Sequence, residues 1–203
     1  DARFFNNCYL LRLEEDSREE WSSLSHRAMS CLMTGGGIGV DVSLCRPSGR
    51  QLRSTGGVAS GPLPLLETLN EIGRNVMQGG SRRSALYGSM NWQHEDVKKL
   101  LVSKNWHDME IKGAYNKDGT PMTIADAKGG DFNYKAPLDM MNISLNYDDD
   151  WLSGNGSEIF RENCRQALTT GEPGFSFNFG EKKNETLRNA CTEITSEDDS
   201  DVC

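Results

Sequence analysis

Short apolar runs alternate with amphipathic stretches along most of the chain, and this pattern predicts its secondary structure. Apolar runs, or apolar residues at every second position, predict β-strands at 4–13, 38–42, 85–91, 138–145 and 175–179. Apolar residues three and four apart predict helices at 17–34, 62–78, 95–104 and 158–168. The segment 105–137 has no clear period, and we expect an irregular excursion there with a short hairpin at 116–119.

Repeated strand–helix units with short linkers are typical of an α/β domain whose strands are mostly parallel. At 203 residues the chain is long enough for one large domain, so we expect a single α/β domain over 1–203. In such domains the functional residues lie at the carboxyl ends of the strands and in the loops that follow.

Composition and charge narrow the classes of partner. A net charge of −8 argues against a nucleic-acid partner, which would require a basic surface, but it leaves nucleotides open. No apolar run approaches 20 residues, so we expect no membrane span. Because the sequence starts at Asp1 rather than Met and stops at Cys203 after an acidic turn, we expect a piece of a longer protein.

The six cysteines are widely scattered and form no C-x-x-C pair, which argues against a zinc or other metal site. A chain with a sizeable core does not need a disulfide framework, so a reducing cytoplasm is the expected location. Cys31, Cys45 and Cys164 are interpreted as core or incidental residues.

One stretch near the end of the chain combines three reactive residue types. Asn189, Cys191 and Glu193 occupy alternate positions, so an extended backbone would place an amide, a thiol and a carboxylate on one face. A thiol beside a hydrogen-bonding amide and a potential base suits sulfur chemistry. The alternative is a structural cysteine on a surface turn.

A glycine-rich stretch at 35–39 has the wrong spacing for a dinucleotide-binding loop, because Val40 stands where the third glycine belongs and no helix pattern follows. We interpret it as a turn leading into a buried strand, where missing side chains let another backbone or a ligand approach closely. The long polar loop 46–61 carries Arg46, Arg50 and Arg53, which can clamp a triphosphate or simply remain solvated.

With these segments in view, the chain resembles the catalytic large chain of ribonucleotide reductases. The resemblance rests on an ordered set of segments: NC at 7–8, GGGIG at 35–39, STGGVASGP at 54–62, QGGSRR at 78–83, GEPGF at 171–175 and NACTEI at 189–194. The short separation between Cys191 and Cys203 and the sequence at 58–62 resemble those of the adenosylcobalamin-dependent members (class II). A class I large subunit, driven by a separate radical subunit, remains an alternative.

The resemblance implies roles for matching residues. Cys191 would carry a transient thiyl radical, Glu193 would take the 3′-hydroxyl proton of the ribose, and Asn189 would hold a substrate hydroxyl. Cys8 and Cys203 would be the dithiol that reduces the ribose and ends as a disulfide, which requires their Cα atoms to lie within about 7 Å.

The resemblance also implies ligand-binding residues. Asn7 and Arg82 would contact the substrate, and a dNTP or ATP effector would be bound by Asp16, Arg46, Arg53 and Arg83. Asp16 can alternatively be a helix cap. The implied partners are a ribonucleoside di- or triphosphate, a thioredoxin- or glutaredoxin-type reductant and a second copy of the chain in a homodimer.

The implied fold is the first half of a ten-stranded α/β barrel, with specificity loops at about 46–61 and 79–85 and a radical-bearing finger loop at about 187–203. The implied cofactor is adenosylcobalamin, and the implied pathway is the supply of deoxyribonucleotides for DNA replication. One departure is Ala190, where the family commonly has proline. The isolated 203 residues are expected to be inactive.

Two hypotheses from other classes remain open. The first is a nucleotide-binding regulatory module without chemistry, in which the basic loops bind a nucleotide and the cysteines are incidental. The second is a thiol-redox enzyme that uses no radical. Replacement of Cys191 separates the regulatory module from the two enzymes, because only the enzymes depend on a thiol.

Overall fold

The computed structural model describes residues 7–52, 56–76 and 84–202. Arg53, Arg82, Arg83 and Cys203, all assigned roles from the sequence, lie outside the described residues. The main strands are β1 Cys8–Leu11, β2 Gly37–Asp41, β3 Leu86–Asn91, β6 Met141–Tyr147, β7 Gly174–Phe177 and β10 Ser200–Val202. The helices are α1 Arg18–Met33, α2 Leu63–Asn75, α3 Val97–Val102, α4 Ile124–Gly130, α5 Asp149–Leu152 and α6 Ser157–Thr170.

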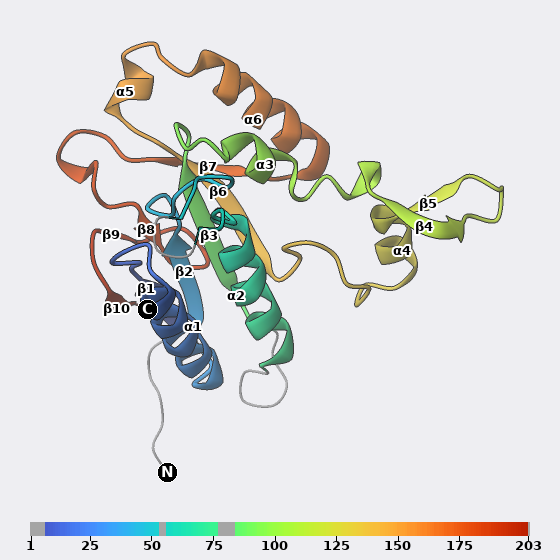
Figure 1. The fold of residues 1–203 in the computed structure, drawn as a ribbon, viewed down its shortest axis with the longest axis horizontal. Coiled ribbons are helices and arrows are strands. Elements are labelled where there is room, and N and C mark those ends of the chain that lie inside the picture. The colour runs from blue at the N-terminus through green and yellow to red at the C-terminus, as the bar shows by residue number, and fades with distance from the viewer. Residues whose placement is uncertain (1–6, 53–55, 77–83, 203) are drawn as a thin grey trace.

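These strands form one six-stranded sheet in the order β10-β1-β2-β3-β6-β7 (Figure 1). Neighbouring strands from β1 to β7 pair in parallel, and β10 pairs antiparallel with β1. Helical crossovers join the parallel strands, as parallel pairing requires. The predicted α/β fold with a mostly parallel sheet is confirmed.

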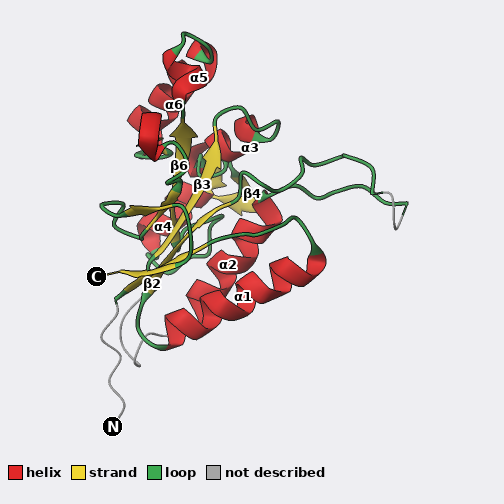
Figure 2. Cartoon of the chain, turned by 90° about the vertical axis from the view of Figure 1, so that its left-hand side faces the viewer, coloured by secondary structure: helices red, strands yellow, loops and turns green. Residues whose placement is uncertain are grey.

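One face of the sheet, the helix face, holds the apolar core. Figure 2 shows α1 and α2 side by side against this face. Each fully buried aliphatic side chain contributes about 1.5–3 kcal/mol to stability. Core residues at alternate strand positions include Leu11, Ile38, Val40, Leu86, Met90, Met141, Ile143 and Leu145.

The strand residues between these core positions point to the opposite face, the hairpin face. Apart from the buried Leu10, this face carries mainly small and polar side chains, several of them fully buried. They include Cys8, Gly37, Gly39, Asp41, Tyr87, Ser89, Ser144, Asn146 and Ser176. A sheet with a polar second face needs a polar cover, and the segment after β7 provides it.

The helix ends follow local sequence signals. Ser17, not Asp16, caps α1: its hydroxyl accepts a hydrogen bond from the Glu20 N–H at 3.1 Å. Asp148 caps α5 in the same way, and Gly171 ends α6 in the left-handed conformation, as its position predicts. Strand β1 is shorter than the predicted run 4–13 and begins at Cys8 within the described residues.

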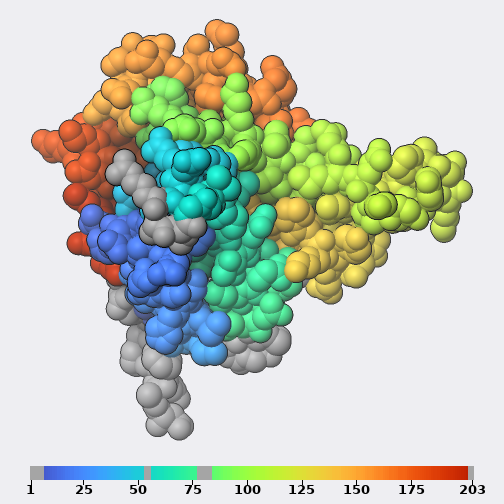
Figure 3. Space-filling model, viewed as in Figure 1, coloured from blue at the N-terminus to red at the C-terminus, as the bar shows by residue number. Residues whose placement is uncertain are grey.

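The hairpin predicted at 116–119 is confirmed, and the rest of the segment 105–137 is more ordered than predicted. A 3-10 turn, Trp106–Asp108, leads into a hairpin of β4 Glu110–Tyr115 and β5 Pro121–Thr123, followed by α4. Thr123 and Asp126 form a reciprocal capping box that starts α4, a signal that the absence of apolar periodicity concealed. Figure 3 shows this segment projecting as an arm from the rest of the molecule.

Among the residues that the structure describes, no helix combines the length and apolar character needed to cross a membrane.

Candidate active site

The stretch with the amide, thiol and carboxylate forms a tight turn at the tip of a hairpin. Strands β8 Leu187–Arg188 and β9 Thr195–Ser196 pair antiparallel on either side of residues 189–194. The Asn189 side-chain oxygen accepts the Ile194 N–H at 3.1 Å, and the Asn189 carbonyl accepts the Thr192 N–H at 2.9 Å. The stretch is therefore not extended, and alternation along a strand does not group these side chains.

The turn nevertheless gives the three side chains different degrees of burial. Asn189 is fully buried and closes the turn, whereas Cys191 and Glu193 are exposed at its tip. Thr192 lies between them with φ of 72°, in the left-handed region that a β-branched residue rarely adopts. The thiol and the carboxylate are therefore presented outward by a turn that is held from within.

Two glycines of β2 let the hairpin lie directly on the hairpin face of the sheet. A Cβ added at Gly39 would be 1.6 Å from the Arg188 carbonyl oxygen, and one added at Gly37 would be 3.1 Å from the Ala190 Cβ. Any larger side chain at Gly39 would displace the hairpin backbone. The interpretation of the glycine-rich stretch as a site of close backbone approach is confirmed.

Strand register brings distant parts of the sequence into one row. The Cα of Cys8 pairs with that of Gly37 on one side and that of Val202 on the other. Ala190, the residue before Cys191, packs on Gly37. The hairpin tip, the buried Cys8 and the strand that precedes Cys203 therefore lie next to one another.

Asn7, a predicted substrate contact, adjoins this row. Its carbonyl oxygen accepts the Gly37 N–H at 2.7 Å, and its side chain is exposed. Within the predicted finger range 187–203, residues 187–196 form the hairpin and β10 returns to the main sheet. The hairpin therefore occupies the first part of that range, and β10 the last.

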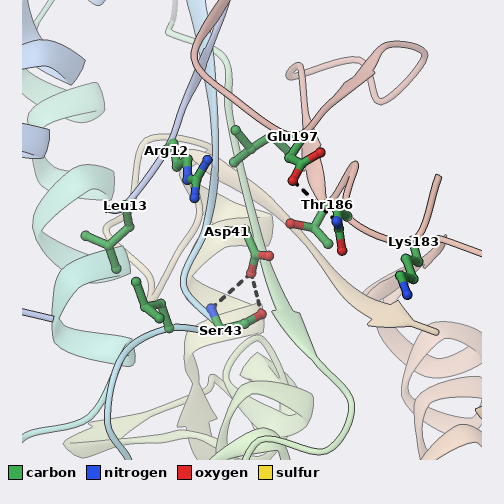
Figure 4. Close-up of a pocket in the computed structure, with 10 residues that line it drawn as sticks. Arg12, Leu13, Asp41, Ser43, Lys183, Thr186 and Glu197 are labelled. Atoms are coloured by element: carbon green, nitrogen blue, oxygen red, sulfur yellow. Dashed lines mark hydrogen bonds between the residues drawn. The ribbon is translucent and has the colours of Figure 1, made fainter. Parts of the chain in front are cut away.

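A cavity of about 480 Å³ opens at the base of the hairpin (Figure 4). Asp41 and Ser43, at the carboxyl end of β2, form one wall, and Thr186 and Glu197 lie opposite. The Asp41 carboxylate accepts the Ser43 N–H at 2.9 Å, a Ser43 hydroxyl bond and a bond from Thr186. Burial raises the pKa of Asp41, and these hydrogen bonds oppose that rise only in part.

A second cavity, of about 410 Å³, lies beside the loops that follow β1 and β2. Two residues predicted to bind the effector, Asp16 and Arg46, line it together with Trp21, Leu52 and others. Arg46 donates to the Asp16 carboxylate from its backbone N–H at 2.9 Å and from its guanidinium, and to the Asp16 carbonyl oxygen at 2.7 Å. The structure thus brings these two distant residues into one place.

Asp96 fixes the loop beside this second cavity. It is 4% exposed and accepts the Ser48 N–H at 2.7 Å, the Ser48 hydroxyl at 2.6 Å and the Lys99 ammonium at 2.7 Å. Burial alone would raise the pKa of Asp96, but the bonds from Lys99 and Ser48 hold it below its usual value. Sequence reasoning missed Asp96, because its partner Ser48 is 48 positions away.

Asp41 and Arg188 were also missed as contributors to the site. Asp41 ends the glycine-rich strand β2, which the sequence analysis considered only for its missing side chains. Its contact with Thr186 joins segments far apart in sequence, so it could not be predicted. Arg188 was missed because it lies just outside the recognisable motif, which begins at Asn189. Among the described residues, no cluster of three or more potential ligands could hold a metal ion.

Comparison with known proteins identifies the family. The model of the ribonucleotide reductase barrel domain matches residues 6–153. The vitamin B12-dependent ribonucleoside-diphosphate reductase of Thermoplasma acidophilum is 32% identical over 98 residues, which are 48% of this chain and 13% of that protein. The ribonucleoside-diphosphate reductase large chain of Encephalitozoon cuniculi is 38% identical over 108 residues, 52% of this chain and 14% of that one.

A solved structure has the same fold. The class Id ribonucleotide reductase alpha subunit of Actinobacillus ureae superposes with a TM-score of 0.62 at 15% identity, covering 88% of this chain and 28% of that one. The matched regions therefore span well under two thirds of these proteins. Because the barrel-domain model covers most of its length, this chain belongs to the ribonucleotide reductase large-chain family.

Proposed function

We propose that this chain forms the part of a ribonucleotide reductase that carries the radical cysteine and the reducing dithiol. In this proposal Cys191 carries a thiyl radical that abstracts the 3′-hydrogen of the ribose. The sulfur–hydrogen bond formed is close in strength to the carbon–hydrogen bond broken, so the transfer is reversible. Exposure of Cys191 at the hairpin tip is what such a step requires of the thiol.

Glu193 and Asn189 serve the same step. Glu193, exposed two residues beyond Cys191, takes the proton of the 3′-hydroxyl as a general base. Asn189 was expected to hold a substrate hydroxyl, and its buried side-chain oxygen already bonds the Ile194 N–H. We therefore propose that Asn189 orients the turn that carries Cys191, in addition to holding a substrate hydroxyl.

Cys8 and Cys203 supply the electrons. The 2′-hydroxyl leaves as water, two electrons and two protons come from the two thiols, and a disulfide forms between them. The product is the 2′-deoxyribonucleotide. The observation that carries the proposal is the register row in which Cys8 pairs with Val202 and with Gly37, against which Ala190 packs. Three widely separated sequence segments meet there, as this chemistry requires.

The substrate is proposed to be a ribonucleoside diphosphate, because the relatives cited above are named for diphosphates. The cavity lined by Asp16 and Arg46 is proposed to take a dNTP or ATP effector. Arg53 and Arg83 would complete that site and Arg82 would face the substrate, together with Asn7. A thioredoxin- or glutaredoxin-type protein would reduce the disulfide, and a homodimer is the proposed assembly.

Adenosylcobalamin is the proposed radical source, since relatives named as vitamin B12-dependent are among the matches. When bound, it supplies the one-electron initiation that side chains cannot. Cys191, whose thiol is exposed at the hairpin tip, is the residue on which such a group would generate the radical. The class I alternative keeps every role given to Cys191, Glu193 and Cys8 and changes only the origin of the radical. Turnover that survives removal of cobalamin would favour class I.

Replacement of Cys191 tests the proposal against its competitors. In the complete polypeptide that contains these residues, Cys191→Ser should abolish turnover of ribonucleoside diphosphates while nucleotide binding, measured by calorimetry, stays within about twofold. Cys164→Ser, at a half-buried cysteine of α6, is the matched control and should retain turnover. A Cys191→Ser protein that still forms deoxyribonucleotide contradicts the proposal. A wild-type protein that binds nucleotides without turnover would favour the regulatory module.

A further inference from the structure

One side chain, Arg188, connects the hairpin to the far strand of the sheet. The Arg188 backbone lies on β2, where its carbonyl oxygen packs on Gly39. Its side chain extends to β7, where Nε donates to the Ser176 hydroxyl at 2.6 Å. In the sheet order, β3 and β6 lie between those two strands. Arg188 therefore spans the hairpin face of the sheet.

The same guanidinium holds the tip of the hairpin. It donates from one terminal nitrogen to the Thr192 carbonyl oxygen at 3.0 Å and from the other to the Phe177 carbonyl oxygen at 3.4 Å. Thr192 follows Cys191 directly and has the left-handed φ described above. The peptide that must be held in an unfavourable conformation is thus linked to the edge strand β7 through the Arg188 guanidinium.

The acceptors explain why arginine suits this position. All three are neutral oxygens, and within the described part of the chain no carboxylate forms an ion pair with Arg188. A planar guanidinium presents its donors in a fixed fork, so one side chain can satisfy three acceptors in different directions. A lysine ammonium keeps the charge but places its donors at a single point.

We propose that Arg188 is a positioning residue that fixes the conformation of the Cys191 turn, because its guanidinium donates both to the Thr192 carbonyl and to Ser176 and Phe177 of β7. The inference rests on the proposed function only where turnover is the readout. Its structural part, that Arg188 restrains the turn, holds for any activity. A displacement of about 1 Å at a reacting group can lower a rate about 100-fold, so loss of this restraint should affect kcat.

The experiment compares Arg188→Met, Arg188→Lys and Ser176→Ala in the complete polypeptide, with Arg165→Met as the control. Arg165 is an exposed arginine of α6 that pairs with Glu162. Hydrogen–deuterium exchange of peptides covering 189–196 reports on the Thr192 and Ile194 amides, which bond Asn189. Steady-state kinetics give kcat and KM separately.

Both Arg188 variants should speed exchange at the tip at least tenfold and lower kcat about 100-fold, with KM changed less than about threefold. Ser176→Ala removes one acceptor, leaves Arg188 in place, and should shift both readouts in the same direction by a smaller factor. It keeps the test informative should an Arg188 variant fail to fold. Arg165→Met should match wild type.

Unchanged exchange at the tip in Arg188→Met overturns the restraint. Faster exchange with unchanged kcat overturns the positioning role. Recovery of both readouts in Arg188→Lys shows that charge alone acts, which also overturns the proposal. Failure of the proposed function appears elsewhere, as turnover that survives Cys191→Ser, and leaves the exchange result standing.

Discussion

At the scale of single residues, burial and hydrogen bonding have opposite effects on the pKa of Asp41. Its carboxyl lies at the base of the hairpin, where burial disfavours the charged form, and hydrogen bonds from Ser43 and Thr186 oppose this only in part. The carboxyl joins the end of β2 to the segment that enters the hairpin. It therefore has a structural role whose strength depends on pH.

The raised pKa of Asp41 predicts the sign of that dependence. The native state holds this proton more tightly than the unfolded state, so stability falls as pH rises from about 4 through the raised value. Asp41→Asn removes the ionisation and should become progressively more stable relative to wild type between pH 4 and pH 7. Thermal unfolding of both proteins at the two pH values measures the difference. Asp150→Asn, at an exposed carboxylate, controls for charge loss.

A Tm difference between Asp41→Asn and wild type that stays constant, or shrinks, as pH rises would contradict this account.

Single residues also show which parts of the site a sequence can reveal. Cys191 and Glu193 were recognisable because their neighbours in sequence form the motif. Asp41 and Arg188 were not, because the atoms that give them a role belong to Thr186 and Ser176, and only the folded chain brings these together.

At the scale of elements, the hairpin of β8 and β9 depends on a strand that lacks side chains. Gly37 and Gly39 alternate with Ile38 and Val40, so β2 presents apolar side chains to the helices and bare backbone to the hairpin. The glycine pattern was correctly interpreted from the sequence, since few other needs explain a missing Cβ within a buried strand.

Gly39→Ala tests this packing. The new Cβ would overlap the Arg188 carbonyl oxygen, so the hairpin must shift, at a cost of about 3 kcal/mol in the free energy of unfolding. The variant should also lose turnover, because Cys191 moves with the hairpin. Denaturant unfolding and steady-state kinetics give the two results. Gly130→Ala at the end of α4, where an added Cβ meets nothing within 4 Å, should change stability by less than about 0.5 kcal/mol.

Equal effects of the two glycine substitutions would show that the hairpin does not rest on Gly39.

The structure that the sequence did not predict lies in segments without a clear apolar period. The arm 105–137 buries little surface, so hydrophobic periodicity, the main signal for helices and strands, is weak there. The conformation of residues 189–194 was left open by the sequence, because alternating residue types occur both in strands and in hairpin tips.

At the scale of the whole molecule, the topology accounts for the site. The predicted alternation of strands and helices was sufficient for an α/β fold, and the parallel sheet follows from it. The antiparallel return of β10 beside β1 could not be predicted from periodicity, since β10 is a three-residue polar strand. That return is what aligns the start of the sheet with the segment ending in Cys203.

The proposed function requires that Cys8 and Cys203, near the two ends of the chain, act as a redox pair beside Cys191. The measurement is a single turnover of the complete, fully reduced polypeptide without external reductant, followed by alkylation of free thiols and peptide mapping. We predict one Cys8–Cys203 disulfide for each deoxyribonucleotide formed, with Cys191 free. Product formed while Cys8 remains a thiol, or with a disulfide between other cysteines, would contradict the account.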